Sequence, residues 1–309
     1  MITHGRMGFV GVDTAHSSIQ KVFPAWADHL GLPSRELKGV DIPLGAPADT
    51  YRRVVADIRD DDDQAGALVT THKVRVYETA GDMFDELDDF ARACGEISSI
   101  SKRAGRMRGH AKDPITVGLA LDEIVPSTYF ADSGASVVCF GAGGSGLALS
   151  WHLAHRADAP SRFVLAAPRT PALDRARRVH VEAGLDPARF VYHHLDPDDP
   201  DGDAARLATQ AGAGALIVNA TGLGKDRPGS PLADSVVFPE RSIVWEFNYR
   251  GSLEFLHQAR AQEAARGLVI EDGWAYFVHG WSQVVAEVFD IPMPMATVHE
   301  LSAIAAAVR

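Results

Sequence analysis

Three glycines spaced as G-x-G-x-x-G constrain the fold of this chain more than any other feature. Gly141, Gly143 and Gly146 come directly after the apolar run 137–140 and directly before a segment with helical spacing. Glycine allows a tight strand-to-helix turn and lets backbone N–H groups approach a pyrophosphate at the helix N-terminus. The pattern predicts a dinucleotide site, although a glycine-rich turn without a ligand is the alternative. The predicted contacts are Gly141, Ala142, Gly143, Gly144, Ser145 and Gly146.

Strands and helices alternate from residue 135 onward. Short apolar runs are separated by segments with helical period, as in a parallel sheet that helices cover on both faces. The predicted strands are Val137–Phe140, Arg162–Ala166, Arg189–His193, Ala215–Val218 and Ile243–Phe247. The stretch His194–Asp203 is rich in Pro, Asp and Gly and is predicted to be a surface loop. This half of the chain is expected to be a Rossmann-type, doubly wound sheet.

The N-terminal part also alternates between short strands and helices. The predicted order β-α-β-α-β covers residues 7–12, 20–30, 37–44, 48–58 and 65–70. Helical spacing resumes through Met83–Ala93, and a hairpin is predicted from Ser98–Lys102 and Arg106–Ala111. Pro114 then opens another predicted helix, with Asp113 in the capping position.

The residues that follow the second predicted strand of the Rossmann part favour NADP. An NAD-preferring site usually has an acidic residue about 20 positions beyond the glycines. Here the strand is followed by Arg169 and Thr170 without a carboxylate, and a guanidinium beside a hydroxyl suits a 2′-phosphate. Asp174 could bind a ribose, but its position is typical of an exposed charge at a helix start. NADP is predicted, with NAD as the less favoured alternative.

Four motifs in a fixed order resemble the shikimate dehydrogenase family over nearly the whole chain. They are V-T-x-x-K ending at Lys73, G-x-x-x-D ending at Asp113, the glycine turn, and Asn219-Ala220-Thr221-Gly222. The resemblance implies two α/β domains with a cleft between them. It implies a substrate-binding and catalytic domain in 1–114, completed by helices in 274–309 after Asp272-Gly273, and an NADP domain in 115–273. A homodimer is a further expectation from the family.

Lys73 and Asp113 correspond to the catalytic pair of that family. Hydride transfer to a carbonyl leaves an alkoxide, to which an ammonium can donate a proton while a carboxylate orients the reacting groups. Taken separately, a surface lysine and a helix cap would explain the two residues. Their joint place in the domain order favours the catalytic roles. On the cofactor side, Asn219, Thr221 and Gly222 end a sheet strand, where doubly wound sheets hold ligands.

The resemblance breaks down at the substrate. Ser17 matches the first of two serines that hold the substrate carboxylate in the family, but Ile19 replaces the second and cannot donate a hydrogen bond. Ala67 and Ser98 stand where the family has asparagines, and Gly280 stands where it has a glutamine, with Gln283 one turn on. Such losses argue for a different ligand. The predicted substrate contacts are Ser17, Ser98, Gln283 and Tyr249, the last from the family's tyrosine near the nicotinamide.

Aromatic and histidine side chains near these positions leave alternatives open. Four rings follow one another closely, and they either line a substrate pocket or face the core: Trp274, Tyr276, His279 and Trp281. His72 and His110 flank the predicted pair and could titrate near neutrality, although a structural role is typical for each. His193 and His194 lack a carboxylate at ligand spacing, which indicates a structural pair.

Composition narrows the class of protein. A net charge of −11 disfavours nucleic acid and anionic membranes as partners, so a small molecule is expected. Cys94 and Cys139 lack the spacing of a disulfide framework or zinc site, and the acidic run Asp60–Asp63 has no metal-ligand pattern. No metal is predicted. Without a signal peptide or membrane span, a cytoplasmic location is expected.

Three functions fit these observations. The leading hypothesis is an NADP-dependent dehydrogenase or reductase that acts on a carbonyl or secondary alcohol of a small cyclic substrate, which need not be shikimate. The second keeps shikimate, quinate or an aminated shikimate analogue as substrate, with rearranged anchors. The third is a nucleotide-binding regulatory module that has lost catalysis.

Overall fold

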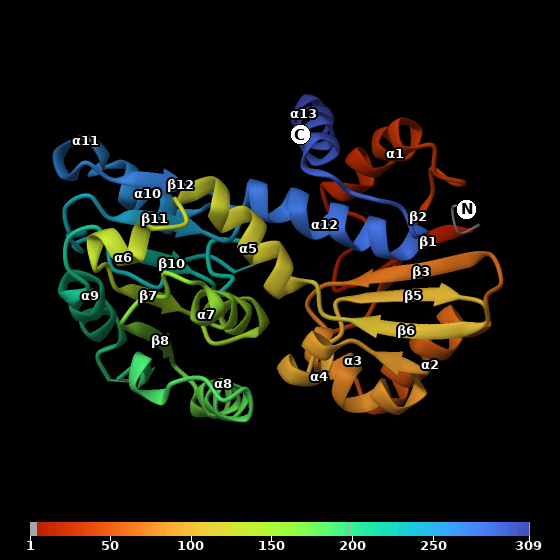
Figure 1. Cartoon of the computed structure of the whole chain (residues 1–309), viewed down its shortest axis with the longest axis horizontal. Coiled ribbons are helices and arrows are strands. Elements are labelled where there is room, and N and C mark those ends of the chain that lie inside the picture. Colours follow the sequence, from red (N-terminus) through yellow and green to blue (C-terminus); the bar gives the residue numbers. More distant parts are fainter. Residues whose placement is uncertain (1–4, 197, 226, 309) are drawn as a thin grey trace. The chain divides into compact units, whose positions relative to one another are not determined.

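The chain divides into two compact units. The computed structural model describes residues 5–196, 198–225 and 227–308. Unit 1 comprises the described residues up to Thr116 and those from Val278 onward, and unit 2 comprises Val117–Phe277. The chain passes from one unit to the other within α5 (Asp113–Ile124) and returns within α12 (Trp274–Phe289) (Figure 1). The predicted domain boundaries, at 114/115 and 273/274, remain predictions.

Unit 1 contains a mixed six-stranded sheet in the order β2-β1-β3-β5-β6-β4. Its strands are β1 (Arg6–Gly11), β2 (Leu37–Asp41), β3 (Gln64–Val69), β4 (Glu86–Leu87), β5 (Ser99–Arg103) and β6 (Arg106–His110). Strand β1 pairs in parallel with β2 and β3, whereas β5 is antiparallel to both β3 and β6. Consequently β3 and β6 run in the same direction, and their carboxyl ends lie at the same edge of the sheet.

Helices cover both faces of this sheet (Figure 1). They are α1 (Ile19–Leu30), α2 (Ala48–Asp60), α3 (Lys73–Ala80), η1 (Gly81–Met83), α4 (Asp89–Cys94), α13 (Met295–Val308) and the end of α12. Helices α2, α3 and α4 bury one face, where Val10 and Val69 belong to one apolar cluster with Val55. On the other face Phe9 contacts Trp281 of α12. Helix α1 packs against α13.

Unit 2 is built on a fully parallel sheet in the order β12-β11-β10-β7-β8-β9. Its strands are β7 (Val137–Phe140), β8 (Phe163–Ala167), β9 (Phe190–His194), β10 (Leu216–Asn219), β11 (Ile243–Glu246) and β12 (Val269–Glu271). From the central β7 the chain adds β8 and β9 on one side and then β10, β11 and β12 on the other. This order is that of a doubly wound sheet and confirms the predicted fold class.

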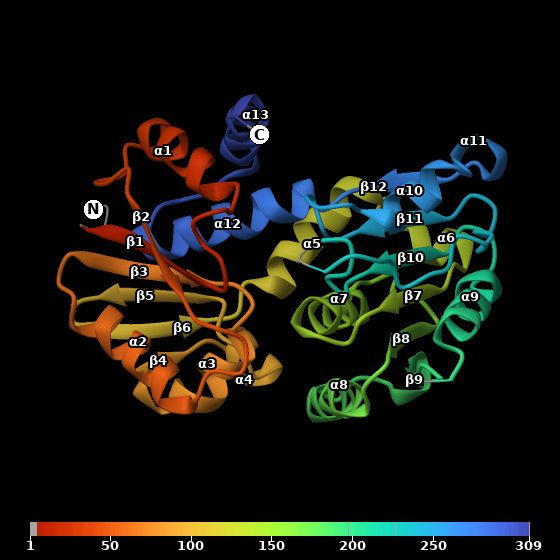
Figure 2. The ribbon, with the colours of Figure 1, turned by 180° about the vertical axis from the view of Figure 1, so that it is seen from behind.

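Helices also flank the sheet of unit 2 (Figure 2). They are α5, α6 (Tyr129–Ser133), α7 (Gly144–His155), α8 (Thr170–Glu182), η2 (Pro187–Arg189), α9 (Pro200–Gln210), α10 (Glu254–Arg260), α11 (Glu263–Arg266) and the start of α12. Helices α9 and α10 bury the face that carries Phe140 and Val244. Helix α7 comes close to Cys139 on the opposite face.

Two predicted segments differ from the structure, and the strands β4 and β12 were missed. The predicted helix Met83–Ala93 is interrupted, because β4 pairs with β6 and the Asp88 carboxylate caps α4 by accepting from Ala91 N. The predicted loop at 194–203 ends earlier, because Asp199 caps α9 and accepts from Gly202 N at 3.1 Å. Pro197 lies outside the described residues. The edge strand β12 was missed because it has no buried apolar residue.

Candidate functional site

The predicted pair Lys73 and Asp113 meets within unit 1. Lys73 is the first residue of α3, shortly after β3 ends, and Asp113 is the first residue of α5, shortly after β6 ends. Because β3 and β6 end at the same edge of the sheet, the two side chains reach each other although 40 positions separate them. Lys73 Nζ donates directly to Asp113 Oδ2.

The backbone on both sides of this contact is fixed by hydrogen bonds. Thr70 N donates to Val10 O at 3.0 Å, and Ile97 N donates to Lys73 O at 3.0 Å. Before Asp113, Lys112 N donates to Ser98 Oγ at 2.7 Å and Lys112 Nζ donates to Glu287 Oε2 at 2.7 Å. Both members of the pair therefore extend from anchored segments, which is the arrangement that precise placement of reacting groups requires.

The side chains of the pair are mostly buried but remain partly exposed to solvent. The Lys73 side chain is 21% exposed and that of Asp113 is 9% exposed. Burial disfavours the ammonium, but the Asp113 carboxylate, the Glu96 carboxylate and the hydrogen bond to Asp113 outweigh it and raise the pKa of Lys73. Lys73 is therefore protonated near neutral pH and can donate a proton to a developing oxyanion.

The histidines beside the pair serve the fold. His72 is buried, with Tyr51 Oη 3.2 Å from Nδ1 and Ile42 O 2.8 Å from Nε2, and burial lowers its pKa. His110 Nε2 lies 3.1 Å from Ser101 Oγ and 3.3 Å from Glu287 Oε1. Both rings are thus held in hydrogen-bonded positions, and the structural interpretation holds for each of them.

His193 has a carboxylate partner that its local sequence does not indicate. Its Nε2 lies 2.7 Å from Asp203 Oδ2. Asp203 stands in the first turn of α9, within the stretch predicted to be a loop, so the missed helix start also hid this contact. The interpretation of the histidine as structural is consistent with the ion pair.

The predicted substrate residues are divided between the units. Ser17 and Gln283 are half-buried in unit 1, and Tyr249 is half-buried in unit 2. Ser98 is buried, and its hydroxyl accepts from Lys112 N and donates to His110 O at 3.4 Å, so it organises the segment before Asp113. The roles of all four in substrate binding stay predictions.

Three positions that depart from the family pattern, Ile19, Ala67 and Gly280, have no polar side chain in this structure. Ile19 and Ala67 are both 0% exposed and pack into the core of unit 1. A Cβ at Gly280 would lie 3.6 Å from Thr116 Cγ2, an ordinary van der Waals distance. Ile19 and Ala67 offer no hydrogen-bonding side-chain group. A substrate bound by unit 1 would therefore lack the anchors predicted from the family.

In unit 2, glycine is suited to each of the three motif positions for a different structural reason. Gly141 has φ of +106°, and a Cβ there would lie 2.5 Å from Ala220 O. A Cβ at Gly146 would lie 2.0 Å from Gly141 O, so glycine is needed for helix α7 to approach the strand. Gly143, the N-cap of α7, has open space around its Cβ position. Its backbone is thereby accessible to a ligand, as a pyrophosphate site requires.

The loop after β10 is organised by a buried polar network. Asn219 Oδ1 accepts from Thr221 N at 3.0 Å and from Thr221 Oγ1 at 2.6 Å. Its Nδ2 donates to Glu246 Oε2 at 2.6 Å, and Glu246 Oε1 also accepts from Asn248 N at 2.7 Å. Gly222 follows with φ of +76°. Asn219 and Thr221 therefore shape the turn, whatever further contacts they make with a nucleotide.

Glu246 was missed in the sequence. It is 0% exposed at the end of β11, and burial raises the pKa of its carboxyl to about 7 even though its hydrogen bonds favour the ionised form. The available signal was a carboxylate directly after the apolar residues of a buried parallel strand, since glutamate is rarely fully buried without partners. Asn248, which donates to it through both N and Nδ2, was missed for the same reason.

The two residues predicted to select NADP stand at the carboxyl end of β8. Arg169 directly precedes α8, and Thr170 is its first residue. Both are exposed, as is Asp174 one turn into the helix. The guanidinium is therefore accessible to an anion beside the carboxyl edge of the sheet, where doubly wound folds bind nucleotides.

The four rings around the start of α12 fall into different environments. In unit 2, Trp274 stacks on Phe277 at 5.1 Å between ring centroids, and Tyr276 stacks on Phe247 at 4.9 Å. In unit 1, His279 and Trp281 are buried. The core interpretation holds for those two, whereas Trp274 and Tyr276 are half-buried.

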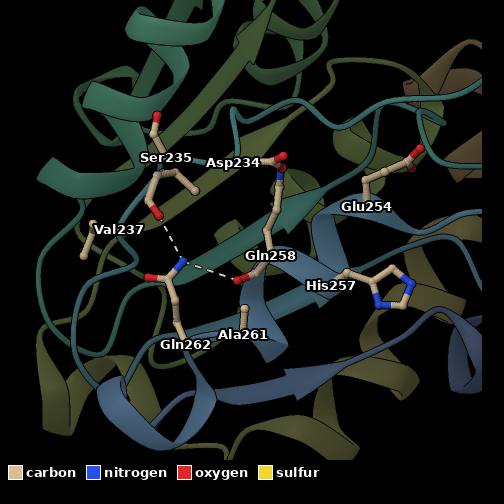
Figure 3. A pocket seen from close by; sticks show the side chains of 9 residues that line it. Asp234, Ser235, Val237, Glu254, His257, Gln258, Ala261 and Gln262 are labelled. Atoms are coloured by element: carbon tan, nitrogen blue, oxygen red, sulfur yellow. Dashed lines mark hydrogen bonds between the residues drawn. The ribbon is translucent and has the colours of Figure 1, made fainter.

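An open groove of about 580 Å³ lies elsewhere on unit 2 (Figure 3). Its lining residues are Asp234, Ser235, Val236, Val237, Glu254, His257, Gln258, Ala261 and Gln262. Gln258 Nε2 donates to Asp234 Oδ1 at 2.8 Å, and Gln262 Nε2 donates to Val236 O at 2.9 Å. These polar groups tie α10 to the preceding loop. The lining includes none of the predicted site residues.

Features of other kinds of site are not found among the described residues. No group of three or more His, Cys, Asp or Glu side chains is arranged to hold a metal ion in residues 5–196, 198–225 and 227–308. Within the same ranges, every helix is too short or too polar to cross a lipid bilayer. Both cysteines are buried thiols.

Comparisons with known proteins agree with this architecture. No protein-family model matches the chain. The shikimate dehydrogenase (NADP(+)) of Symbiobacterium thermophilum is 27% identical over 280 residues, which cover 88% of this chain and 85% of that protein. The structure of shikimate 5-dehydrogenase from Thermus thermophilus, in complex with NADP(H) and shikimate, is similar with a TM-score of 0.69. It shares 23% identity and covers 97% of this chain and 99% of that one.

A quinate dehydrogenase from Corynebacterium glutamicum, in complex with NAD, has a TM-score of 0.74 at 20% identity, over 98% of this chain and 99% of that one. Fold and glycine turn define a class, the two-unit α/β proteins in which one unit is a Rossmann sheet. Within this class, the chain is similar in sequence and in fold to shikimate dehydrogenases.

Proposed function

We propose that the protein is an NADP(H)-dependent oxidoreductase that interconverts a carbonyl and a secondary alcohol on a small cyclic substrate, which need not be shikimate. The contact between Lys73 Nζ and Asp113 Oδ2 carries this proposal. It places a protonated amine and its orienting carboxylate in an anchored, mostly buried setting, as acid–base chemistry at a carbonyl requires. The name of the relative from Symbiobacterium thermophilum specifies the same cofactor and reaction class.

The residues of unit 2 fit NADP(H). The backbone at Gly143 is open to a pyrophosphate, and the exposed Arg169 and Thr170 suit a 2′-phosphate. The residues that would hold the nucleotide are Gly141, Ala142, Gly143, Gly144, Ser145, Gly146, Arg169, Thr170, Asn219, Thr221 and Gly222. When bound, the cofactor supplies or accepts the hydride.

Lys73 and Asp113 of unit 1 carry out the proton transfer. During reduction the substrate oxygen gains negative charge, and Lys73 donates a proton to it. Asp113 accepts a hydrogen bond from Lys73 and thereby holds the ammonium in place. During oxidation the same amine, once deprotonated, removes the proton from the alcohol. Nζ gives up a proton in reduction and takes one up in oxidation, so one residue can serve both directions.

The lost anchors support a substrate other than shikimate. Ile19 and Ala67 provide no hydrogen bond, so discrimination by several hydroxyl and carboxylate contacts is weakened. Ser17, Gln283 and Tyr249 are accessible enough to contact a substrate. The relatives named for shikimate and quinate support a second candidate, in which those substrates, or an aminated shikimate analogue, bind through rearranged contacts.

The proposal is tested with purified protein, NADPH or NADH, and a panel of cyclic ketones, cyclic alcohols, shikimate and quinate. We expect NADPH-linked turnover of at least one cyclic substrate and tighter binding of NADPH than of NADH. Lys73→Ala should lower kcat by about 100-fold or more, because it removes the general acid. The Kd of NADPH should stay within about twofold, because the predicted nucleotide contacts belong to unit 2 and Lys73 belongs to unit 1.

Other outcomes separate the alternatives. Turnover of shikimate or quinate at ordinary rates would identify the second candidate. Binding of NADPH with no turnover across the panel would replace the enzyme by a nucleotide-binding regulatory module. The expected homodimer and the cytoplasmic location stay predictions, for which light scattering and cell fractionation are the measurements.

A further inference from the structure

Glu96 is a carboxylate residue enclosed in unit 1. It follows Gly95, which ends α4 in the left-handed conformation, and lies shortly before β5. The residue is 0% exposed, and its chain neighbours Cys94 and Ile97 are buried as well. Glu96 N donates to Ala91 O at 3.3 Å, so the segment is held against the end of α4.

The surroundings of Glu96 make an ionised carboxylate costly. Val76 and Ala80 of α3, together with Ala91 and Ile97, belong to one buried apolar cluster. A charge in such an environment is strongly destabilising unless an opposite charge compensates for it. The presence of a glutamate here therefore calls for a compensating cation.

Lys73 supplies that cation. Ile97 N donates to Lys73 O at 3.0 Å, so the chain next to Glu96 runs alongside the first residue of α3. The charged groups that act on the ammonium are Asp113, from the start of α5, and Glu96, from the segment before β5. Both raise the pKa of Lys73 against the effect of burial.

We propose that Glu96 is a positioning residue for Lys73, a second carboxylate that acts with Asp113 to hold the ammonium in its charged, proton-donating state. Asp113 makes the direct contact, and the fully buried Glu96 compensates the ammonium as a second carboxylate. The inference rests on the proposed function for its effect on catalysis, but not for its effect on the charge of Lys73.

The arrangement has a directional consequence. Loss of the proton from Lys73 leaves the Asp113 and Glu96 carboxylates without the cation that compensates them, which is unfavourable in a buried site. Proton donation by Lys73 must then be followed by rapid reprotonation. The oxidation direction, which needs the free amine, should require higher pH than in an enzyme whose lysine has one carboxylate partner.

The direct test measures the titration of Lys73 itself by competitive chemical labelling of lysines across pH, read by mass spectrometry. Compared with the wild-type protein, Glu96→Gln should lower the pKa of Lys73 by about one unit or more. The matched control is Glu78→Gln, because Glu78 lies on the same helix but is exposed and pairs with Arg75 at 2.7 Å. An unchanged Lys73 titration in folded Glu96→Gln overturns the proposal.

A second variant covers the case in which Glu96→Gln does not fold. In Asp113→Asn the direct partner is lost, and burial alone would bring the pKa of Lys73 below its ordinary 10.5. If Glu96 compensates the ammonium, the pKa stays close to that value in Asp113→Asn. A pKa far below it in Asp113→Asn shows that Glu96 contributes little and overturns the proposal.

Kinetics then connect the charge to the reaction. With any substrate that the panel identifies, the alkaline limb of kcat/KM for reduction should move to lower pH in Glu96→Gln by the same amount as the labelled titration. Affinity for NADPH should be unchanged. If no substrate is turned over, the proposed function fails, while the labelling result still decides the role of Glu96.

Discussion

At the scale of single residues, Glu246 links the stability of unit 2 to pH. The carboxyl group is fully buried and accepts from Asn219 Nδ2 and Asn248 N, while burial raises its pKa to about 7 from an ordinary 4.5. Between these two values the folded chain holds a proton that the unfolded chain has lost. Its contribution to stability is therefore fully present below pH 4.5, falls as pH rises, and is lost above about pH 7.

Glu246→Gln should remove this pH dependence. The difference in the free energy of unfolding between wild type and variant should change by up to about 3 kcal/mol between about pH 4.5 and 7.5, with wild type losing stability as pH rises. Chemical denaturation at several pH values measures it, and other titrating groups cancel in the difference. A constant difference across this range would show that the donors around Glu246 keep it ionised.

Burial of Glu246 could have been inferred, because it ends an apolar parallel strand, whereas the sequence gives no comparable sign for Glu96. Glu96 is buried because helices and strands distant in the sequence enclose it. Lys73 and Asp113 were identified because their place in the order of motifs was informative. Ser98 was predicted as a substrate contact, and its bond to Lys112 N was not foreseen, because it depends on a turn that residue spacing does not specify.

At the scale of elements, the glycine turn between β7 and α7 contains one glycine that the packing of the fold requires and another that leaves room for the nucleotide. A methyl group at Gly146 would collide with Gly141 O, whereas one at Gly143 would occupy open space. The two positions lie on the same turn of chain. Substitution by alanine is thus a matched pair of perturbations with opposite expected effects.

Gly146→Ala should lower the free energy of unfolding by about 1–3 kcal/mol, as forced overpacking does. Gly143→Ala should change stability little but weaken NADPH binding by about tenfold or more, because its methyl group stands where the pyrophosphate would approach. Thermal unfolding and NADPH titration distinguish the effects. Equal loss of stability in both variants would contradict the assignment of separate roles.

The predicted elements succeeded where burial produced a clear pattern. The strands β7, β8 and β10 are short, continuous apolar runs, as parallel strands covered on both faces must be. Failures occurred where local polar groups decide. The Asp88 and Asp199 caps start α4 and α9 inside stretches whose composition indicated otherwise, and edge strand β12 needs only one partner.

At the scale of the whole molecule, unit 2 is one continuous stretch of chain and unit 1 is not. The doubly wound sheet and both layers of its core come from residues between 117 and 277. A fragment spanning residues 113–277 should therefore fold by itself and bind NADPH with a Kd within about tenfold of the full chain, which circular dichroism and calorimetry can measure. Failure of a folded fragment to bind would show that unit 1 contributes essential nucleotide contacts.

The discontinuity of unit 1 has a consequence for the newly made protein. Trp26 Nε1 donates to Leu301 O at 2.8 Å, so helix α1 of unit 1 depends on a contact with a residue that is made 275 positions later. During translation, unit 2 can reach its final structure before helix α13, which belongs to unit 1, has been synthesised. The half of the molecule that holds Lys73 and Asp113 is thus the last to become native, and a truncated chain would carry a nucleotide fold without a finished proton donor.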